Sequence, residues 1–363
     1  MTQLYFDYSA SLAFVALLLY GVVFLRYHHG IRHDMPQSNK YAFVALSLII
    51  CSVFAFASHD TYHYMEHYQE MLYYNQIVHV EKFYFWLVQA LPTNYYLWRL
   101  CVWGPAALLF VFACKRYRLN ANVVGLLLIA FVLDNFVITR GALGFAMLLV
   151  GLSYITKPMP IKFLSYLFGA ILLYLSLALH RTIGIYMIFI PLALFFSLKK
   201  GFKASVVAFP FLYVLVLGIS ASLMNNPTVM SMFGETIDTY FEMEESQLNM
   251  IGQIRQVIEY APYLLLMYFV VRNISKYPAL YSKSAHFMAK YAYVLIYVSM
   301  LFFMQPISSW ISSRTLHAAV FPLVICSAEY LNVNRRSKTD ARILFLFIFV
   351  SLFQYVYNIY DWM

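Results

Sequence analysis

The residues best suited to chemistry are five arginines, each next to the start of an apolar stretch: Arg99, Arg140, Arg181, Arg255 and Arg314. If such a stretch is a helix, its first turn carries unpaired backbone N–H groups and the positive end of the helix dipole. A guanidinium placed there adds a planar fork of donors that matches phosphate oxygens. Several such ends facing one cavity would bind a pyrophosphate or another anionic group. The alternative is that these arginines anchor helix ends to lipid headgroups or pair with nearby carboxylates.

His180 is a second candidate, because it directly precedes Arg181 and lies between two strongly apolar stretches. Ionisable groups close to membrane depth are costly and usually face a cavity or a partner. A neutral histidine there can accept a proton at physiological pH. The alternative is a structural histidine whose ring bonds a neighbouring backbone carbonyl.

The elements that must position these residues are membrane helices. The chain has 363 residues, of which 63% are hydrophobic and 11% charged, whereas a soluble domain is roughly 45–50% apolar and about 25% charged. Apolar stretches of about 17 to 22 residues, each long enough to cross a bilayer core of roughly 30 Å, recur along the whole chain. We therefore predict one all-α polytopic membrane domain over residues 1–363 with about twelve transmembrane helices. The predicted spans are 5–25, 41–57, 95–114, 121–138, 141–156, 161–179, 182–198, 204–223, 257–271, 289–305, 315–331 and 343–359.

The sidedness of these spans follows from the distribution of charge. The chain has 25 Lys and Arg against 16 Asp and Glu, a formal net charge of +9. With the N-terminus outside, the inner loops receive most of the cations, and the outer side keeps only Lys82 and the five arginines. Because basic residues favour the cytoplasmic side, we predict that both termini and the five arginines face outward. The positive charge is then a topology signal, and no nucleic-acid partner is expected.

Two outer loops, at about 58–94 and 224–256, are longer than a simple connection requires. The first is rich in tyrosine and predicts a short amphipathic helix at the membrane interface. The second is acidic and predicts a solvated amphipathic helix, or else a lid or an acceptor-binding loop. The sequence has no CxxC pair, no DxD-type pattern and no glycine-rich phosphate loop, so we predict neither a metal nor a cofactor.

One set of motifs suggests a family. Asp60, Tyr64 and Tyr68 recur at intervals of four residues in the first large outer loop and are followed by Glu81. Further along, Arg140 opens a stretch rich in small residues, His180 ends the next stretch, and Arg314 precedes a late one. In their order, spacing and common outer placement, these motifs resemble the EpsG-like group of Wzy-type polysaccharide polymerases, over about residues 55–330.

The resemblance implies a polytopic glycosyltransferase of the type C class (GT-C) in a bacterial cytoplasmic membrane, with its active site facing outward. Such an enzyme moves a growing glycan from polyprenyl pyrophosphate onto the sugar of another lipid-linked repeat unit. The product would be an O-antigen, a capsule or an exopolysaccharide. The implied partners are the lipid-linked donor and acceptor, the bilayer and a chain-length regulator.

The residues then take expected roles. Arg140, Arg181 and Arg314, with Arg255 as a further candidate, would bind the pyrophosphate and stabilise its developing charge without a metal. The acceptor hydroxyl needs a general base, for which Asp60, His180 and Glu81 are candidates, and Glu81 would otherwise orient the acceptor or a neighbouring base. Tyr64 and Tyr68 would stack on sugar rings or contact polyprenyl chains, or else belong to an ordinary aromatic belt.

Two other classes of protein remain alternatives. A flippase or exporter of lipid-linked oligosaccharide would carry charge along a central path with inverted repeats, whereas the ionisable residues here collect at one face. An integral sugar acyltransferase would need an acyl-donor entry on the inner side. The only inner cluster of that kind is His28, His29, Arg32 and His33, which fits a solvated basic loop.

Overall fold

A computed structural model describes residues 41–54, 68–74, 82–91, 93–127, 141–180, 182–224, 250–303 and 309–333. In these ranges every regular element is helical, so the predicted all-α class is confirmed for this part of the chain. A short helix covers residues 68–73. The longer helices are α2 (Tyr41–Phe54), α4 (Lys82–Ala90), α5 (Tyr95–Arg116), α6 (Ala121–Leu127), α8 (Ala142–Thr156), α9 (Lys162–Leu179), α10 (Thr182–Phe195), α11 (Leu198–Met224), α14 (Met250–Lys276), α15 (Lys283–Leu301) and α16 (Ser309–Val333).

Four segments of these helices are long and apolar enough to cross a membrane: Leu97–Arg116, Lys162–Leu179, Leu198–Ile219 and Arg314–Val333. The helices α8 and α10 are apolar but shorter, at 15 and 14 residues, where a perpendicular crossing needs about 20. Several long apolar helices mark an integral membrane protein. The predicted number of twelve spans is not shown, and the predicted spans 5–25 and 343–359 lie outside the described residues.

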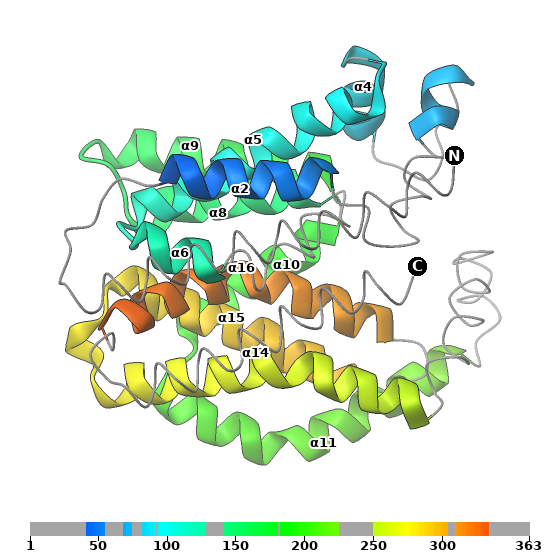
Figure 1. Ribbon diagram of the computed structural model, residues 1–363. Coiled ribbons are helices and arrows are strands. Elements are labelled where there is room, and N and C mark those ends of the chain that lie inside the picture. Colours follow the sequence, from blue (N-terminus) through cyan, green and yellow to red (C-terminus); the bar gives the residue numbers. More distant parts are fainter. Residues whose placement is uncertain are drawn as a thin grey trace.

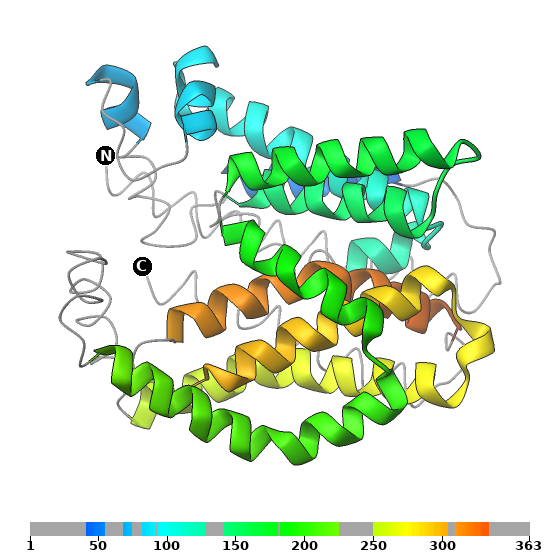
Figure 2. The ribbon, with the colours of Figure 1, turned by 180° about the vertical axis from the view of Figure 1, so that it is seen from behind.

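The helices lie side by side and run back and forth between two ends of the molecule (Figure 1). The helix α8 packs most extensively on α9 and α5, and α15 packs most extensively on α16. Seen from behind, α10 crosses obliquely from the α8–α9 pair toward α11, which lies along the edge (Figure 2). The helix α10 follows α9 in the chain and packs mainly on α15. It therefore connects the group of α5, α8 and α9 to the pair of α15 and α16.

One end of the molecule is basic. The turns from α5 to α6, from α8 to α9 and from α14 to α15 gather there, on the left of Figure 1. Arg116 is the last residue of α5. Its Nε donates to Ser153 Oγ at 2.9 Å, and its Nη2 donates to the carbonyl of Lys157 at 2.9 Å. Lys157 Nζ donates in return to the Arg116 carbonyl at 2.7 Å. These cations satisfy carbonyls at the C-terminal ends of α5 and α8. We call this the basic end, and the end where α8, α10 and α16 begin the site end.

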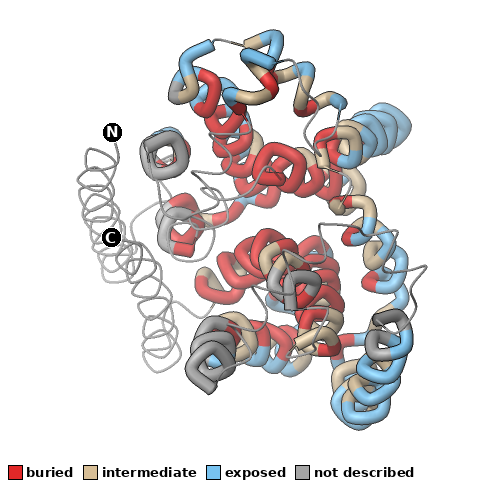
Figure 3. The backbone as a smooth tube through the Cα atoms, turned by 90° about the vertical axis from the view of Figure 1, so that its right-hand side faces the viewer, coloured by how far each residue is buried: buried red, intermediate tan, exposed pale blue. Residues whose placement is uncertain are grey.

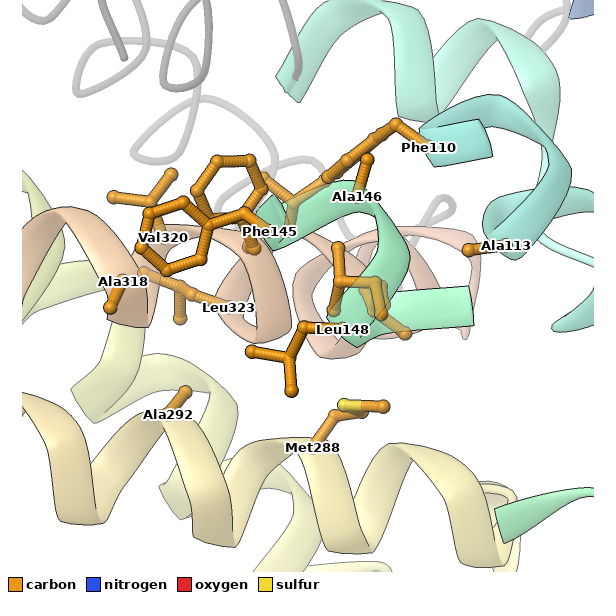
Figure 4. Close-up of a cluster of buried hydrophobic side chains, with 14 of the residues drawn as sticks. Phe110, Ala113, Phe145, Ala146, Leu148, Met288, Ala292, Ala318, Val320 and Leu323 are labelled. Carbon is orange, nitrogen blue, oxygen red and sulfur yellow. The ribbon is translucent and has the colours of Figure 1, made fainter. Parts of the chain in front are cut away.

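Buried residues gather where helices lie next to one another, and exposed residues lie mainly on the outermost helices (Figure 3). In the middle of the structure Phe110, Phe145, Leu148, Met288 and Leu323 meet from four helices (Figure 4). Many large apolar side chains of α9, α10 and α11 are exposed. In a bilayer such faces contact lipid, so helix association depends on close packing and interhelical hydrogen bonds.

The α8–α9 pair has the close approach that small residues permit. A Cβ atom on Gly151 would lie 3.1 Å from the carbonyl oxygen of Gly169, and the reverse contact is also 3.1 Å. Ser176 Oγ donates to the carbonyl of Gly144 at 2.6 Å. Hydroxyl-to-carbonyl bonds and glycine contacts of this kind are how helices associate in lipid. They fix the relative positions of the start of α8 and the end of α9.

Candidate functional site

The connection from α9 to α10 is a very short turn built on His180. His180 has an extended backbone, with φ −153° and ψ 108°. Its N–H donates to the Ser176 carbonyl at 3.2 Å, and its own carbonyl accepts from the N–H of Ile183 at 3.0 Å. Because both backbone groups are hydrogen-bonded, the chain fixes the place from which the imidazole projects.

The His180 ring lies against the start of α8. A Cβ atom built on Gly141 would be 3.1 Å from Cδ2 of His180 and 3.0 Å from Cε2 of Phe145, so the imidazole and the Phe145 ring both lie against this glycine. One turn later, a Cβ atom on Gly144 would be 2.5 Å from Cδ1 of Ile183 in the first turn of α10. The first turns of α8 and α10 are therefore in direct contact.

Two predicted phosphate-binding residues adjoin this contact in sequence. Arg140 directly precedes Gly141, and Arg181 stands between His180 and Thr182. Both arginines lie outside the described residues. The described residues that flank them are in contact, and Gly141 is the N-cap of α8, with no side chain to bind the N–H groups of the first turn. Such a helix start suits an anionic group.

The expectation that Arg314 and Arg255 stand at helix starts was wrong. The helix α16 begins at Ser309 and α14 begins at Met250, so both arginines lie in the second turn of their helices. The apolar stretches begin later than the helices, because polar residues such as Ser312 extend α16 beyond its apolar part. Their roles as phosphate ligands remain predictions, now without a contribution from their own helix starts.

A hydroxyl network fixes the first turns of α16. The Tyr260 hydroxyl on α14 lies 2.6 Å from Ser312 Oγ. Ser312 Oγ donates to the Ser299 carbonyl at 2.8 Å, and Ser299 Oγ donates to the Ser312 carbonyl at 2.7 Å. This exchange between α15 and α16 satisfies buried polar groups. It holds α16 only two residues before Arg314.

Arg314 is half-buried on α16, and His317 follows it by three residues, which puts the two side chains on one face of that helix. Aromatic packing brings α8, α10 and α16 together, because Phe145 of α8 stacks on Tyr186 of α10 at 5.6 Å and on Phe321 of α16 at 4.8 Å. The structure thus brings α8, α10 and α16 together at the site end.

Tyr186 and His317 were not predicted from the sequence. Tyr186 stands in the apolar helix α10 and His317 in the apolar part of α16, where a tyrosine or histidine reads as an ordinary core residue. The signal that could have found His317 is its spacing of three residues from Arg314, which puts both side chains on one face of a helix.

The first outer loop is fastened to α5 by aromatic side chains, which we call the aromatic anchor. Tyr68 lies 5.1 Å from Trp98 and 5.2 Å from Tyr95, and Tyr84 of α4 meets Trp98 edge-on at 5.6 Å. The Trp98 ring also contacts Trp103 at 5.6 Å. These contacts bind helix 68–73 and α4 to the first turns of α5.

Tyr68 and Arg99 belong to this anchor. Tyr68 was predicted to contact sugar or lipid, and its ring is 2% exposed. Burial, together with Tyr73 and Tyr95, raises the pKa of Tyr68 to about 12, so its hydroxyl stays protonated. The buried Arg99 guanidinium lies 5.4 Å from the centre of the Trp103 ring, a cation–π distance. Asp60, Tyr64 and Glu81 precede the two anchored helices and lie outside the described residues.

A search of the described residues for metal ligands found no group of three or more His, Cys, Asp or Glu side chains that could hold an ion.

The protein was compared with known families. The family model described as "EpsG family" matches residues 40–362, which include every described helix and every predicted site residue. The chain belongs to the EpsG family. The resemblance predicted from the motifs is thereby confirmed, and it extends beyond the predicted range of 55–330. As an EpsG-family membrane protein, the chain is linked to exopolysaccharide biosynthesis. Searches of curated proteins and of solved structures found no match.

Proposed function

We propose that this EpsG-family protein is a metal-independent glycosyltransferase that polymerises polyprenyl-pyrophosphate-linked repeat units into a surface polysaccharide. The polysaccharide is an O-antigen, a capsule or an exopolysaccharide, made at the outer face of a bacterial cytoplasmic membrane. The observation that carries the proposal is the contact of His180 with Gly141. It joins the starts of two helices at the residues that flank Arg140 and Arg181.

The chemistry fits a site of this composition. The acceptor hydroxyl attacks the anomeric carbon of the donor glycan, and the bond from that carbon to the pyrophosphate oxygen breaks. The pyrophosphate leaves with the electron pair, so negative charge grows on it. Arg140, Arg181 and Arg314 stabilise that charge, and the N–H groups at the start of α8 add further donors.

The acceptor proton needs a base at the same end of the molecule. His180 supports this role best among the described residues, because its backbone is held at both N–H and carbonyl and its ring borders the start of α8. Asp60 is the other candidate base, and Glu81 is proposed to orient the acceptor. Asp60 precedes helix 68–73 in the sequence, and Glu81 precedes α4. Because the aromatic anchor holds both helices on the start of α5, we propose that it also keeps these two acidic residues near the site end.

The test uses membranes that contain single variants and synthetic lipid-linked repeat units, with glycan length as the readout. Arg140→Ala, His180→Ala and Asp60→Asn are expected to slow chain extension by about a hundredfold or more, the usual loss when a group that stabilises a transition state is removed. Arg272→Ala is the matched control, because Arg272 is an exposed arginine near the opposite end of α14. Normal extension by all three site variants would refute this assignment.

A deletion strain tests the activity class separately. We expect single repeat units to accumulate on polyprenyl pyrophosphate, because repeat units are still made and exported when only polymerisation is lost. Full-length chains in that strain would contradict the polymerase proposal and favour an exporter or an acyltransferase.

A further inference from the structure

The basic end holds two cations in fixed positions against each other. Arg116 donates to Ser153 Oγ and to the Lys157 carbonyl, both at 2.9 Å, and Lys157 Nζ donates to the Arg116 carbonyl at 2.7 Å. A guanidinium carries five N–H donors and a lysine ammonium carries three. Within the described residues, these bonds use two of the first set and one of the second. Both half-buried cations therefore keep N–H groups for another acceptor.

The turn that carries Lys157 is itself held in place. Ser165 of α9 is buried, and its Oγ donates to the Tyr154 carbonyl at 2.9 Å and accepts from the Met159 N–H at 3.0 Å. These two bonds close the turn from α8 to α9 on both sides. The position of Lys157 at the edge of α5 is thus part of the fold.

Arg118 adds a third cation, in a backbone conformation that glycine favours. Its φ is 58°, the only positive φ of a non-glycine residue in the described part of the chain. Its N–H donates to the Lys115 carbonyl at 3.0 Å, and the Leu119 N–H donates to the Cys114 carbonyl at 3.2 Å. This pattern ends a helix with a left-handed residue, which is usually glycine. Here the chain carries an exposed, charged side chain instead.

The cations at this end have little negative charge to balance them. Among the described residues of the basic end, the only carboxylate is Glu329, and it is engaged with Ser282. The carboxylate accepts from the Ser282 N–H at 2.5 Å and from its Oγ at 2.7 Å. Burial and the charges of Arg118 and Arg116 lower the pKa of Lys157 and outweigh the opposite effect of Glu329. An anion bound here would relieve this repulsion.

The same cations stand where helices leave the membrane. The candidate span Leu97–Arg116 ends among them, and the span Lys162–Leu179 begins at the next turn. On α5, Leu108, Phe112 and Lys115 are exposed at intervals of four and three residues, which puts them on one face of the helix. That outer face therefore changes from apolar to basic at the membrane boundary.

The start of α9 shows the same change. Ile161 and Phe163 are 61% and 73% exposed, and the exposed Lys162 stands between them. Apolar surface that runs directly into cations fits a molecule with both acyl chains and a phosphate. An acidic protein segment outside the membrane would use the cations and leave the apolar side chains uncovered. The observations therefore favour a phospholipid.

We propose that the basic end binds an anionic phospholipid, whose phosphate is held by four cations that we call the headgroup cluster: Lys115, Arg116, Arg118 and Lys157. With the predicted sidedness, this lipid belongs to the inner leaflet. Its phosphate joins the end of α5 to the turn between α8 and α9, and Lys162 borders the cluster. The site lies at the opposite end from the site end and does not depend on the proposed polymerase activity.

The test measures the melting midpoint of the purified protein in nanodiscs of phosphatidylcholine that contain a rising fraction of phosphatidylglycerol. We expect the wild type to melt several degrees higher as phosphatidylglycerol is added, because a ligand that binds the folded state stabilises it. An equal midpoint in both lipids would overturn the proposal and favour an acidic protein segment as the occupant.

Arg118→Gly is the most informative variant, because it removes a cation and supplies the residue that the left-handed conformation favours. In pure phosphatidylcholine its midpoint should equal or exceed that of the wild type, so a folding defect cannot explain a loss of response. It should need about fivefold more phosphatidylglycerol for half of the shift, the contribution of one basic residue at an anionic membrane surface. Arg118→Lys, which keeps the charge, should restore most of the response.

Arg272→Gln is the matched control. It removes an exposed arginine from α14, which packs mainly on α16 and α15 and not on the headgroup cluster's helices. This variant should keep the wild-type response to phosphatidylglycerol. An equal loss in Arg272→Gln and Arg118→Gly would show that any positive charge serves, and the proposed site would be wrong.

A last arm separates the lipid from free phosphate. Inorganic phosphate added to the wild type in phosphatidylcholine nanodiscs should leave the midpoint unchanged, because it has no acyl chains to cover the apolar faces of α5 and α9. If inorganic phosphate alone produces the shift that phosphatidylglycerol produces, the assignment to a lipid is overturned.

Discussion

The contact between Gly144 and Ile183 offers the sharpest test of how the site end is assembled. A Cβ atom on Gly144 would lie 2.5 Å from Cδ1 of Ile183 and 3.3 Å from the carbonyl oxygen of Ser176. Ile183 is fully buried in the first turn of α10. Gly144→Ala must therefore displace the buried Ile183 side chain or the start of α10, at the residues next to His180 and Arg181.

The size of the effect follows from two opposing contributions. An extra methyl group in a well-packed region costs about 1–3 kcal/mol, and alanine gains about 1 kcal/mol over glycine in a helix. Gly218→Ala on α11 is the matched control, since a Cβ atom there meets nothing within 4 Å. Gly218→Ala gains only the higher helix propensity of alanine. The difference in unfolding free energy between Gly144→Ala and Gly218→Ala therefore gives the cost of the new contact, about 1–3 kcal/mol.

Ile183→Val provides the rescue, because it deletes the Cδ1 atom that the new methyl group meets. Alone it should destabilise by about 0.5–1.5 kcal/mol. The double variant should be more stable than the sum of the two single changes predicts, by about 1 kcal/mol. Unfolding free energies are measured in mixed detergent micelles, and chain extension is measured in parallel. Strict additivity of the two changes would refute the proposed packing of α8 on α10.

Three further predictions concern the supports of the site. Trp98→Ala should lower the unfolding free energy by about 3–5 kcal/mol and expose the first outer loop to limited proteolysis, because the Trp98 ring is the centre of the aromatic anchor. Trp98→Phe should protect the loop better, and equal cleavage of both variants would contradict the anchor. Tyr260→Phe should lower the unfolding free energy by about 1 kcal/mol, because it removes the hydroxyl bound to Ser312; an unchanged value would rule out a stabilising bond. Arg116→Lys should destabilise by about 1–2 kcal/mol, because the Arg116 guanidinium makes two hydrogen bonds and lies 3.8 Å from the centre of the Tyr154 ring, and a lysine cannot keep all three contacts. A melting curve identical to that of the wild type would show that the basic end does not depend on this guanidinium.

The helices of the site end were largely predictable from the sequence. The predicted spans 141–156 and 161–179 agree closely with α8 and α9, because long apolar stretches and the polar turns between them leave few alternatives. Position relative to a helix start was harder to predict. Hydropathy marks where lipid contact begins, whereas α14 and α16 begin earlier, where serine and other polar residues still continue the helix.

Side-chain partners were the least predictable part of the candidate site. The outer tyrosines all fit an interfacial belt, yet Tyr68 packs inside the aromatic anchor, against Tyr95 and Trp98 of α5. Tyr186 gave no signal of its own, because its stacking on Phe145 depends on how α10 crosses α8. A local pattern cannot encode a crossing that is set by distant packing.

The short range of the α8–α9 contacts has a consequence for how the protein is made. The approach of Gly151 to Gly169, the bond from Ser176 to Gly144 and the contact of His180 with Gly141 all join residues of one continuous segment, 141–180. A hairpin with such local contacts can assemble soon after it leaves the ribosome, whereas Arg314 joins only when the last described helix has been synthesised. The two parts of the proposed site therefore form at different times during synthesis. The position of the His180 imidazole is set when segment 141–180 folds, and the proposed pyrophosphate ligand Arg314 is added only when α16 has been made.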